Sequence, residues 1–374
     1  MMKTYKVDYD QYNKIIMIAD IHLGCRAASE EWQENIKNYF YEWFIPFLKT
    51  NSEHSILCVL GDVYDNRKSI NIAVNNLAID IFEDLSKILP VYIISGNHDL
   101  YKKTFDSQTS LRSLDNIKHV NVITEPSLMK FIRKDETVIE SLALPYLGNK
   151  EEGSWLEKYS DLDFAFMHSE IMNLKMDNGQ NICTGANPKK FKGKIYSGHI
   201  HWRQQKGNAM YVGSPYQLRR SDIGNEKGIY ILDLESKSHK FHKNTYSPKF
   251  QKINIDELMD MDEKSQKALL ENNYNDILIP EEYIKQKKYK ISNVYDLAEK
   301  FKCKRFEIVP LKNSNSWNIT DSSINDVKEL NLENLINLNI ENLPDIPDEK
   351  KTELKKLSGD YYKAAEHELE NSNI

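Results

Sequence analysis

Short apolar runs alternate with longer amphipathic segments over the first two thirds of the chain. The runs are "KIIMIAD", "SILCVLGD", "PVYIISGNHD", "DFAFMHSE" and "GKIYSGHIH", and each has the length and composition of a buried strand. Between them lie segments with helical periodicity, such as "SEEWQENIKNYFYEWFIPFL" and "NIAVNNLAIDIFEDLSKIL". Strands that alternate with helices in this way predict an α/β fold.

The pattern changes after Tyr211. "AMYVGSPYQLRR" and "KGIYILDLESKSHKFHKN" are typical of later strands, the second of a hairpin, and from "KFQKINI" to "KRFEIVPL" the order is strand, helix, strand, helix, strand. "KNSNSWNITDSS" has the composition of a linker, and two apolar helical segments follow it. We therefore expect a main domain over 1–246, a small α+β domain over 247–312, and a linker with a helical hairpin over 313–374.

Each of the five early apolar runs is followed by side chains that bind metals. These are Asp20, His22, Asp62, Asn97, His168, His199 and His201. Ligands of α/β proteins gather at the carboxyl ends of the strands, so strands that neighbour one another in one sheet would bring these side chains to a single rim. Alternate residues of an extended chain face the same way, so Asp20 and His22 can reach one site, as can His199 and His201.

The ligand types narrow the metal class. Carboxylate, amide and imidazole ligands without thiolate suit manganese, iron or zinc at a catalytic site better than a structural zinc site. The four cysteines form no C-x-x-C pair. The seven candidates exceed the need of one tetrahedral ion and suffice for two if a carboxylate bridges them. Two ions roughly 3.5–4 Å apart form the clamp that enzymes use for in-line phosphoryl displacement.

Structural interpretations of the single motifs stay open. A lone Asp after a strand is more often a turn or cap residue, and "GNHD" alone is compatible with a turn. His54, His119, His239, His242 and His367 have no comparable context, and we expect them to be structural. Five motifs in this order, each after an apolar run, favour a metal site.

The ordered motifs resemble those of the calcineurin-like metallophosphoesterases. "ADIHLG", "LGDVYDNRKS" and "YVGSPYQLRR" resemble, more particularly, the SbcD-type (meiotic-recombination-eleven-like) DNA repair nuclease subunits, among them the short phage recombination endonuclease subunit. The resemblance spans most of residues 14 to 201 and is weaker after 245. It implies a β-sandwich flanked by helices, a small α+β capping domain that contacts DNA, and a C-terminal helical segment.

The resemblance also implies roles for single residues. Asp20, His22, Asp62 and His201 would hold one divalent ion, and Asp62, Asn97, His168 and His199 the other. Manganese would be preferred, with Mg²⁺, Fe²⁺ or Zn²⁺ as alternatives. His98 would face the scissile phosphate and assist the leaving oxygen, and the Asp65 side chain would orient His98. The alternative, that Asp65 is a solvated turn residue with no role at the site, is given equal weight.

The function implied is a manganese-dependent DNA nuclease. It would act as a 3′-5′ exonuclease on duplex ends and as an endonuclease on single strands and hairpins, within an SbcC/SbcD-type complex for double-strand-break repair and recombination. The resemblance implies a homodimer and an SMC-type ATPase partner that docks on the C-terminal helical segment. The alternative is a dinuclear phosphatase or phosphodiesterase with a non-DNA substrate. A scaffold on an inactive fold is disfavoured because no ligand is missing.

Net charge and hydropathy limit the partners and the cellular location that the sequence predicts. The net charge of −6 argues against a broadly basic nucleic-acid binder. Local basic groups, including Arg219, Arg220 and the stretch 189–194, could still line a phosphate track. The polar start lacks a signal-peptide core, and no apolar run has the length of a membrane span. We therefore expect a cytoplasmic protein, in the bacterial host cytoplasm if a phage encodes it.

Overall fold

The structure is a computed structural model that describes residues 2–102, 108–148, 151–286, 288–311, 350–352 and 354–356. The chain divides into two compact units, 1–310 and 311–374. In the second unit, residues 350–352 and 354–356 are helical. The remainder of the predicted linker and helical hairpin lies outside the described residues.

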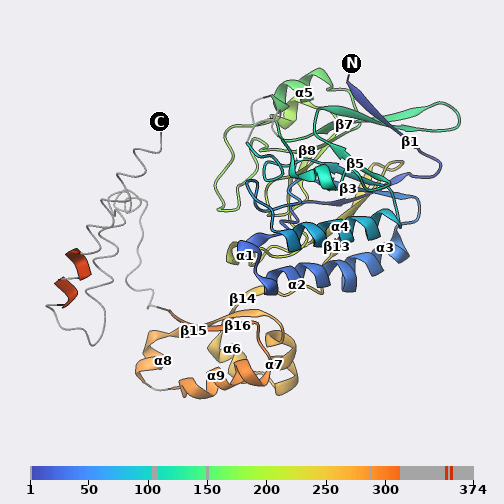
Figure 1. The fold of residues 1–374 in the computed structure, drawn as a ribbon. Coiled ribbons are helices and arrows are strands. Elements are labelled where there is room, and N and C mark those ends of the chain that lie inside the picture. The colour runs from blue at the N-terminus through green and yellow to red at the C-terminus, as the bar shows by residue number, and fades with distance from the viewer. Residues whose placement is uncertain are drawn as a thin grey trace. The chain divides into compact units, whose positions relative to one another are not determined.

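Two sheets form the main part of the first unit (Figure 1). The six-stranded sheet has the order β13 (Ser238–Lys243), β12 (Gly228–Asp233), β2 (Lys14–Ile18), β3 (Ser55–Leu60), β4 (Val91–Ile94), β5 (Val120–Ile123). The seven-stranded sheet has the order β1 (Lys3–Asp8), β6 (Ser127–Ile132), β7 (Val138–Leu144), β8 (Phe164–His168), β9 (Lys194–Gly198), β11 (Ala209–Tyr211), β10 (Gln204–Lys206). The strands β2 to β5 are mutually parallel, as are β7, β8, β9 and β11.

The central strands are buried on both faces. Ile15 and Met17 of β2 pack with Phe164 and Phe166 of β8 in the core between the two sheets, while Ile16 of β2 belongs to the core beneath the helices. Because successive side chains of a strand point to opposite faces, a strand covered on both sides needs an uninterrupted apolar sequence. This explains the apolar runs of the sequence.

Helices cover the outer faces of the sandwich. α2 (Glu30–Asn38), the π-helical η1 (Tyr39–Phe44), α3 (Ile45–Asn51) and α4 (Ile72–Ser86) run along the six-stranded sheet, as Figure 1 shows. α5 (Glu152–Lys158) contributes Leu156 to the core on the outer face of the other sheet. The predicted helix-flanked β-sandwich is thus confirmed. Short helices α1 (Cys25–Ala28), η2 (Ser110–Ser113), η3 (Pro188–Lys190) and η4 (Arg220–Asp222) lie in the loops.

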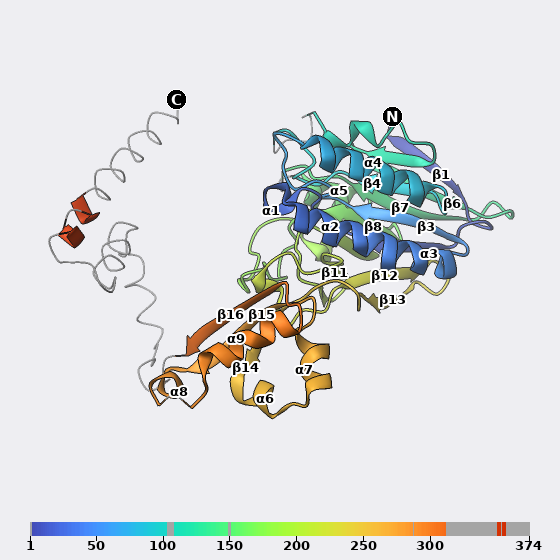
Figure 2. The same cartoon turned by 60° about the horizontal axis from the view of Figure 1, so that its bottom comes forward.

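A third, three-stranded sheet follows the sandwich (Figure 2). It consists of β14 (Phe250–Asn254), β15 (Tyr274–Pro280) and β16 (Arg305–Leu311), with α6 (Ile255–Asp260), α7 (Glu263–Leu270), α8 (Glu281–Lys285) and α9 (Ile291–Lys300). Ile253 and Ile277 belong to a separate small core. The order of elements agrees with the sequence pattern, and the division into capping and main domains stays a prediction.

The other face of this small sheet packs on α2. The Trp32 ring is stacked on those of Phe250 and Tyr274, with centroids 6.0 and 5.6 Å apart. The Tyr274 hydroxyl donates to Glu31 at 2.7 Å and accepts from the Asn35 side chain at 2.9 Å. The small sheet is therefore joined to the sandwich by both apolar and polar contacts. Within the described part of the chain, no helix has the length and hydrophobicity that crossing a membrane requires.

Candidate metal centre

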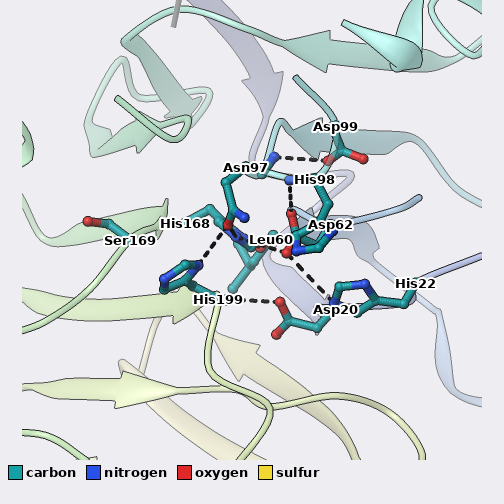
Figure 3. Close-up of polar contacts among 12 residues, drawn as sticks. Asp20, His22, Leu60, Asp62, Asn97, His98, Asp99, His168, Ser169 and His199 are labelled. Carbon is teal, nitrogen blue, oxygen red and sulfur yellow. Dashed lines mark hydrogen bonds and ion pairs between the residues drawn. The ribbon is translucent and has the colours of Figure 1, made fainter. Parts of the chain in front are cut away.

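All seven predicted ligand residues lie in one cluster at the carboxyl ends of strands. Asp20 and His22 follow β2, Asp62 follows β3, Asn97 follows β4, His168 ends β8, and His199 and His201 follow β9. Figure 3 shows these side chains, except that of His201, converging on a common centre. The sequence analysis considered the case in which these strands neighbour one another in one sheet; in the structure β2, β3 and β4 belong to one sheet of the sandwich, and β8 and β9 belong to the other. The site forms because the carboxyl ends of these strands, in both sheets, lie at the same end of the sandwich.

The backbone turns sharply at four of these positions. The backbone φ angles are positive, at 54°, 51°, 53° and 90° for Asp20, His22, Asp62 and His199. Residues other than glycine rarely adopt this backbone conformation. Backbone bonds from Asp20 N to Gly61 O and from His22 N to Asp62 O, both 3.0 Å, join the turns after β2 and β3. Strained backbone of this kind clusters at functional sites.

Two glycines make room for the cluster. A Cβ atom on Gly61 would lie 2.2 Å from the His168 ring, and one on Gly96 would lie 2.2 Å from the Asp62 carboxylate. Both glycines therefore allow the backbone to approach the ligand side chains more closely than any other residue permits.

Asp62 lies between two groups of histidines. Its Oδ2 atom is 3.7 Å from His22 Nε2 and 3.4 Å from His168 Nε2, while its Oδ1 atom accepts the backbone N–H of His98 at 2.8 Å. On one side, the Nε2 atoms of His22 and His201 face each other at 3.1 Å. On the other, Asn97 Oδ1 lies 3.1 Å from His168 Nε2 and 2.8 Å from His199 Nδ1.

Asp20 completes the first group. Its Oδ1 atom accepts the backbone N–H of His199 at 2.9 Å. Its Oδ2 atom is buried and has no hydrogen-bond partner among the described residues. A buried carboxylate oxygen without a partner is costly, and a cation held together with His22 and His201 would satisfy it. The donor set, with its oxygen and nitrogen atoms and no thiolate, fits divalent ions of the manganese and zinc type.

The outward nitrogen of each of the four histidines has a carboxylate or carbonyl oxygen within 4 Å, although that of His201 lies nearer to the Arg219 guanidinium. His168 Nδ1 lies 2.8 Å from Leu60 O, and His22 Nδ1 lies 3.0 Å from Asp65 Oδ1. His199 Nε2 is 3.9 Å from Glu170 Oε1, and His201 Nδ1 is 3.7 Å from Asp177 Oδ2. Metal-binding histidines present one nitrogen to the ion and the other to a carboxylate or carbonyl. His168 and His22 show this pattern at hydrogen-bond distance, and a carboxylate lies farther away, at 3.9 and 3.7 Å, from His199 and His201.

The sequence analysis missed Glu170 and Asp177. Glu170 is two residues after His168, a spacing that gave a signal in Asp20-x-His22 but was not used here. Asp177 lies in an irregular loop, and nothing local in the sequence distinguishes it from other surface acids. His54, His119, His239 and His242 belong to none of the candidate metal groups, and His367 lies outside the described residues.

The charges of the cluster act strongly on one another. Burial raises the pKa of Asp62, but His168 and His22 outweigh it and hold that pKa well below its usual range. Burial lowers the pKa of His168, but the Asp62 carboxylate outweighs it and raises the pKa to about 9. Burial raises the pKa of Asp20 to about 6 and holds that of His201 well below its usual value. Divalent ions would replace the protons that these groups otherwise share.

Residues 13–203 match the family model described as calcineurin-like phosphoesterase. The chain belongs to this family. It is 28% identical over 238 residues to "Exonuclease subunit 1" of Enterobacteria phage T4, covering 62% of this chain and 68% of the relative. A solved structure of an archaeal phosphodiesterase aligns with 62% of this chain and 99% of its own, at 13% identity and a TM-score of 0.32. The family model and the phage relative confirm the predicted family resemblance and a metal-dependent phosphoesterase activity.

In this phosphoesterase, His98 and Asp65 lie beside the metal cluster, but not as predicted. The Asp65 carboxylate contacts His22, and it is the backbone carbonyl of Asp65 that lies on His98 Nδ1. The reason is the bond from Asp65 N to Leu23 O, 2.9 Å, which holds residue 65 against the turn that carries His22. Asp65 therefore contacts both histidines, with its side chain on the candidate ligand.

Asp99 holds together two of the turns that carry the candidate ligands. It is fully buried. Its carboxylate accepts backbone N–H groups of Val63, Tyr64 and Gly96 at 3.0, 3.1 and 2.9 Å. These bonds join the turns that carry Asp62 and Asn97. Burial raises the pKa of Asp99 to about 7.

The phosphoesterase site opens into a pocket of about 420 Å³, whose lining includes His98, Arg26 and Arg219. Arg219 Nη2 lies 2.9 Å from His201 Nδ1. Arg220, in contrast, is bound to Asp276 at 2.7 Å and to Glu307, both in the small sheet. The two arginines that the sequence analysis treated alike thus have different surroundings, and only Arg219 lines the pocket.

Proposed function

We propose that this phosphoesterase is a manganese-dependent DNA nuclease, the catalytic subunit of an SbcC/SbcD-type complex for double-strand-break repair and recombination. The observation that carries the proposal is the Asp62 carboxylate, 3.7 Å from His22 and 3.4 Å from His168. One carboxylate between two histidine groups suits a pair of ions. The similarity to a phage exonuclease subunit supports DNA as the substrate.

In this proposal the ligands divide into two sets that share Asp62. Asp20, His22, Asp62 and His201 hold one ion, and Asp62, Asn97, His168 and His199 hold the other. The pair of ions, when bound, supplies Lewis-acid polarisation of the phosphate and neutralises charge on the attacking and leaving oxygens. Manganese suits a mixed set of imidazole, carboxylate and amide ligands.

His98 is proposed as the proton donor to the leaving group. Its backbone N–H is bound to Asp62, and its Nδ1 is bound to the carbonyl of Asp65. With Nδ1 occupied, Nε2 is the atom that can deliver a proton. Water attacks phosphorus in line and releases one proton to the solvent, the bond from phosphorus to the 3′-oxygen breaks, and that oxygen takes a proton from His98 Nε2, which the solvent then restores. The products are a 3′-hydroxyl and a 5′-phosphate.

The burial of His98 bears on this role. Burial lowers the pKa of His98 below its usual value, so the imidazole alone is mostly neutral near pH 7. The phosphodiester anion, or the alkoxide that develops at the leaving oxygen, favours the protonated form when it lies beside His98. The proton donor is therefore charged when substrate is bound.

We further propose 3′-5′ exonuclease action on duplex ends and endonuclease action on single strands and hairpins. Residues 247–312 would form the DNA-contacting capping domain, residues 313–374 would dock the ATPase partner, and the protein would be a homodimer. The name of the phage relative, an exonuclease subunit, supports a partner protein.

A nuclease assay on a hairpin-ended duplex with Mn²⁺ tests the proposal. Wild type is compared with His98→Gln, and a chromogenic phosphodiester serves as the small substrate. We expect wild type to cut DNA and His98→Gln to lose about 10²–10⁴-fold in rate, the usual contribution of a general acid, while it still binds two metal ions. If only the small phosphodiester is hydrolysed, even with an SbcC-type ATPase supplied, DNA is not the substrate.

A further inference from the structure

The loop after β8 brings two carboxylates to the candidate ligands on the neighbouring strand. Glu170 faces His199 and Asp177 faces His201. The Tyr211 hydroxyl fixes the start of this loop, since it accepts the N–H of Ile171 at 2.7 Å and donates to Ser169 O at 3.2 Å. The loop is therefore anchored to the strand next to β9, whose end carries both histidines.

Asp177 itself is held in place. Its Oδ1 atom accepts the backbone N–H of Trp202 at 3.1 Å, which is the residue directly after His201. Its Oδ2 atom lies 3.7 Å from His201 Nδ1, and its side chain is 18% exposed, so water screens the pair only partly. One oxygen of Asp177 is thus committed to the backbone, and the other is directed to the imidazole.

Arg219 contacts the same nitrogen. Its Nη2 atom lies 2.9 Å from His201 Nδ1 and 3.8 Å from Asp177 Oδ2. Guanidinium has only donors, so Nδ1 must accept in this contact. A neutral imidazole that accepts at Nδ1 carries its proton on Nε2.

That arrangement conflicts with metal binding through Nε2, the atom that faces His22 at 3.1 Å. Coordination at Nε2 requires the proton on Nδ1, and Nδ1–H then requires an acceptor. Asp177 Oδ2 is an acceptor on that side, and Arg219 cannot be one.

We propose that Asp177 is the positioning residue that holds His201 in its metal-binding tautomer, and that Arg219 leaves Nδ1 and turns to the phosphate of the substrate. This inference rests on the metal assignment of the proposed function. Arg219 already lines the pocket, and its side chain is half exposed. The movement would place a cation beside the substrate at the same time as the ion binds.

Metal titration of variants tests this inference. In Asp177→Asn, the amide oxygen keeps the Trp202 bond, and the NH₂ group then donates to Nδ1 and favours the wrong tautomer. We expect one of the two Mn²⁺ ions to bind about 10–100-fold more weakly, the usual effect of losing such a partner, and the other to bind as in wild type. Isothermal titration calorimetry with Mn²⁺ gives both affinities.

Two further variants sharpen the result. Asp177→Ala offers no donor to Nδ1, so it should weaken the same ion less than Asp177→Asn. A merely structural role predicts the reverse order, because alanine removes the Trp202 bond as well. The matched control is Asp161→Asn, since Asp161 forms an exposed ion pair with Lys192 and should leave both affinities unchanged.

Arg219→Gln separates the two roles. It should bind Mn²⁺ at least as tightly as wild type, while KM for DNA rises about tenfold or more, as expected when one charged hydrogen bond is lost. The inference is wrong if Asp177→Asn binds both ions as wild type does, or if Arg219→Gln binds them more weakly. Failure of wild type to bind Mn²⁺ at all would instead overturn the proposed function.

Discussion

Asp62 Oδ2 lies 3.4 Å from His168 Nε2. The negative carboxylate raises the pKa of His168, and the positive imidazolium lowers the pKa of Asp62. The pair forms where β3 and β8 end, on different sheets. The contact therefore joins the two sheets of the sandwich inside the candidate metal centre. The protonation of His168 consequently affects both folding and metal binding.

The first prediction concerns pH in the presence of a chelator. The pKa of His168 is raised from 6.5 to about 9, so its contribution to stability is complete below pH 6.5 and is lost as the pH rises towards 9. Thermal unfolding in EDTA should therefore show Tm falling between pH 6.5 and 9.

The matched variant for the pH prediction is His168→Gln. It should flatten this fall, because the titrating group is gone. With Mn²⁺ present the slope should reverse, because ions compete with the proton on His168. An equal slope in wild type and variant would contradict the prediction.

The second prediction concerns Gly96. A Cβ atom there would lie 2.2 Å from Asp62 Oδ1 and 2.4 Å from Asp62 N, so Gly96→Ala must displace the carboxylate that both ligand sets share. We expect loss of stoichiometric Mn²⁺ binding, measured by calorimetry. Gly153→Ala is the control, since Gly153 lies in α5 with nothing near its Cβ position, and this change should stabilise the protein by about 0.5–1 kcal/mol.

The third prediction concerns Asp99. Asp99→Asn keeps the size of the side chain but replaces one acceptor oxygen by a donor, so at least one of the bound N–H groups of Val63, Tyr64 and Gly96 loses its partner. An unsatisfied buried group costs about 1–3 kcal/mol. Urea unfolding should show a loss of this size. Metal affinity should also fall, because the turns of Asp62 and Asn97 are no longer joined. Unchanged stability would show that these bonds contribute nothing.

The fourth prediction compares two lysines. Lys227 is buried, and its ammonium group donates to Asp222 at 2.8 Å and to the carbonyl of His201 at 2.5 Å. Lys227→Met leaves the Asp222 charge buried without its cation and should cost about 3–5 kcal/mol of unfolding free energy. Lys192→Met breaks the exposed pair with Asp161 and should change stability by less than about 1 kcal/mol. Similar losses of unfolding free energy in the two variants would show that the buried ion pair of Lys227 contributes no more to stability than the exposed pair of Lys192.

The sequence predicted the site better than the strands that carry it. The order of Asp20, Asp62, Asn97 and His168 after apolar runs was sufficient to place them together. Local patterns indicate that a strand is buried, but they do not indicate which sheet it joins, so the sequence predicted a sandwich without assigning each strand to one of its two sheets. The contact of Asp65 with His22 depends on a backbone bond to Leu23, and the approach of Asp177 depends on a long loop. Neither leaves a periodic signal.

The centre draws its ligands from residue 20 through residue 201 and from two sheets. No local fragment of the chain contains a complete set, so an ion cannot direct early folding. Contacts of such high sequence separation form late, after the loops between them have closed. Ions would therefore select and stabilise a sandwich that has already closed, by mass action in proportion to their concentration. In this protein, metal binding would report that folding is complete.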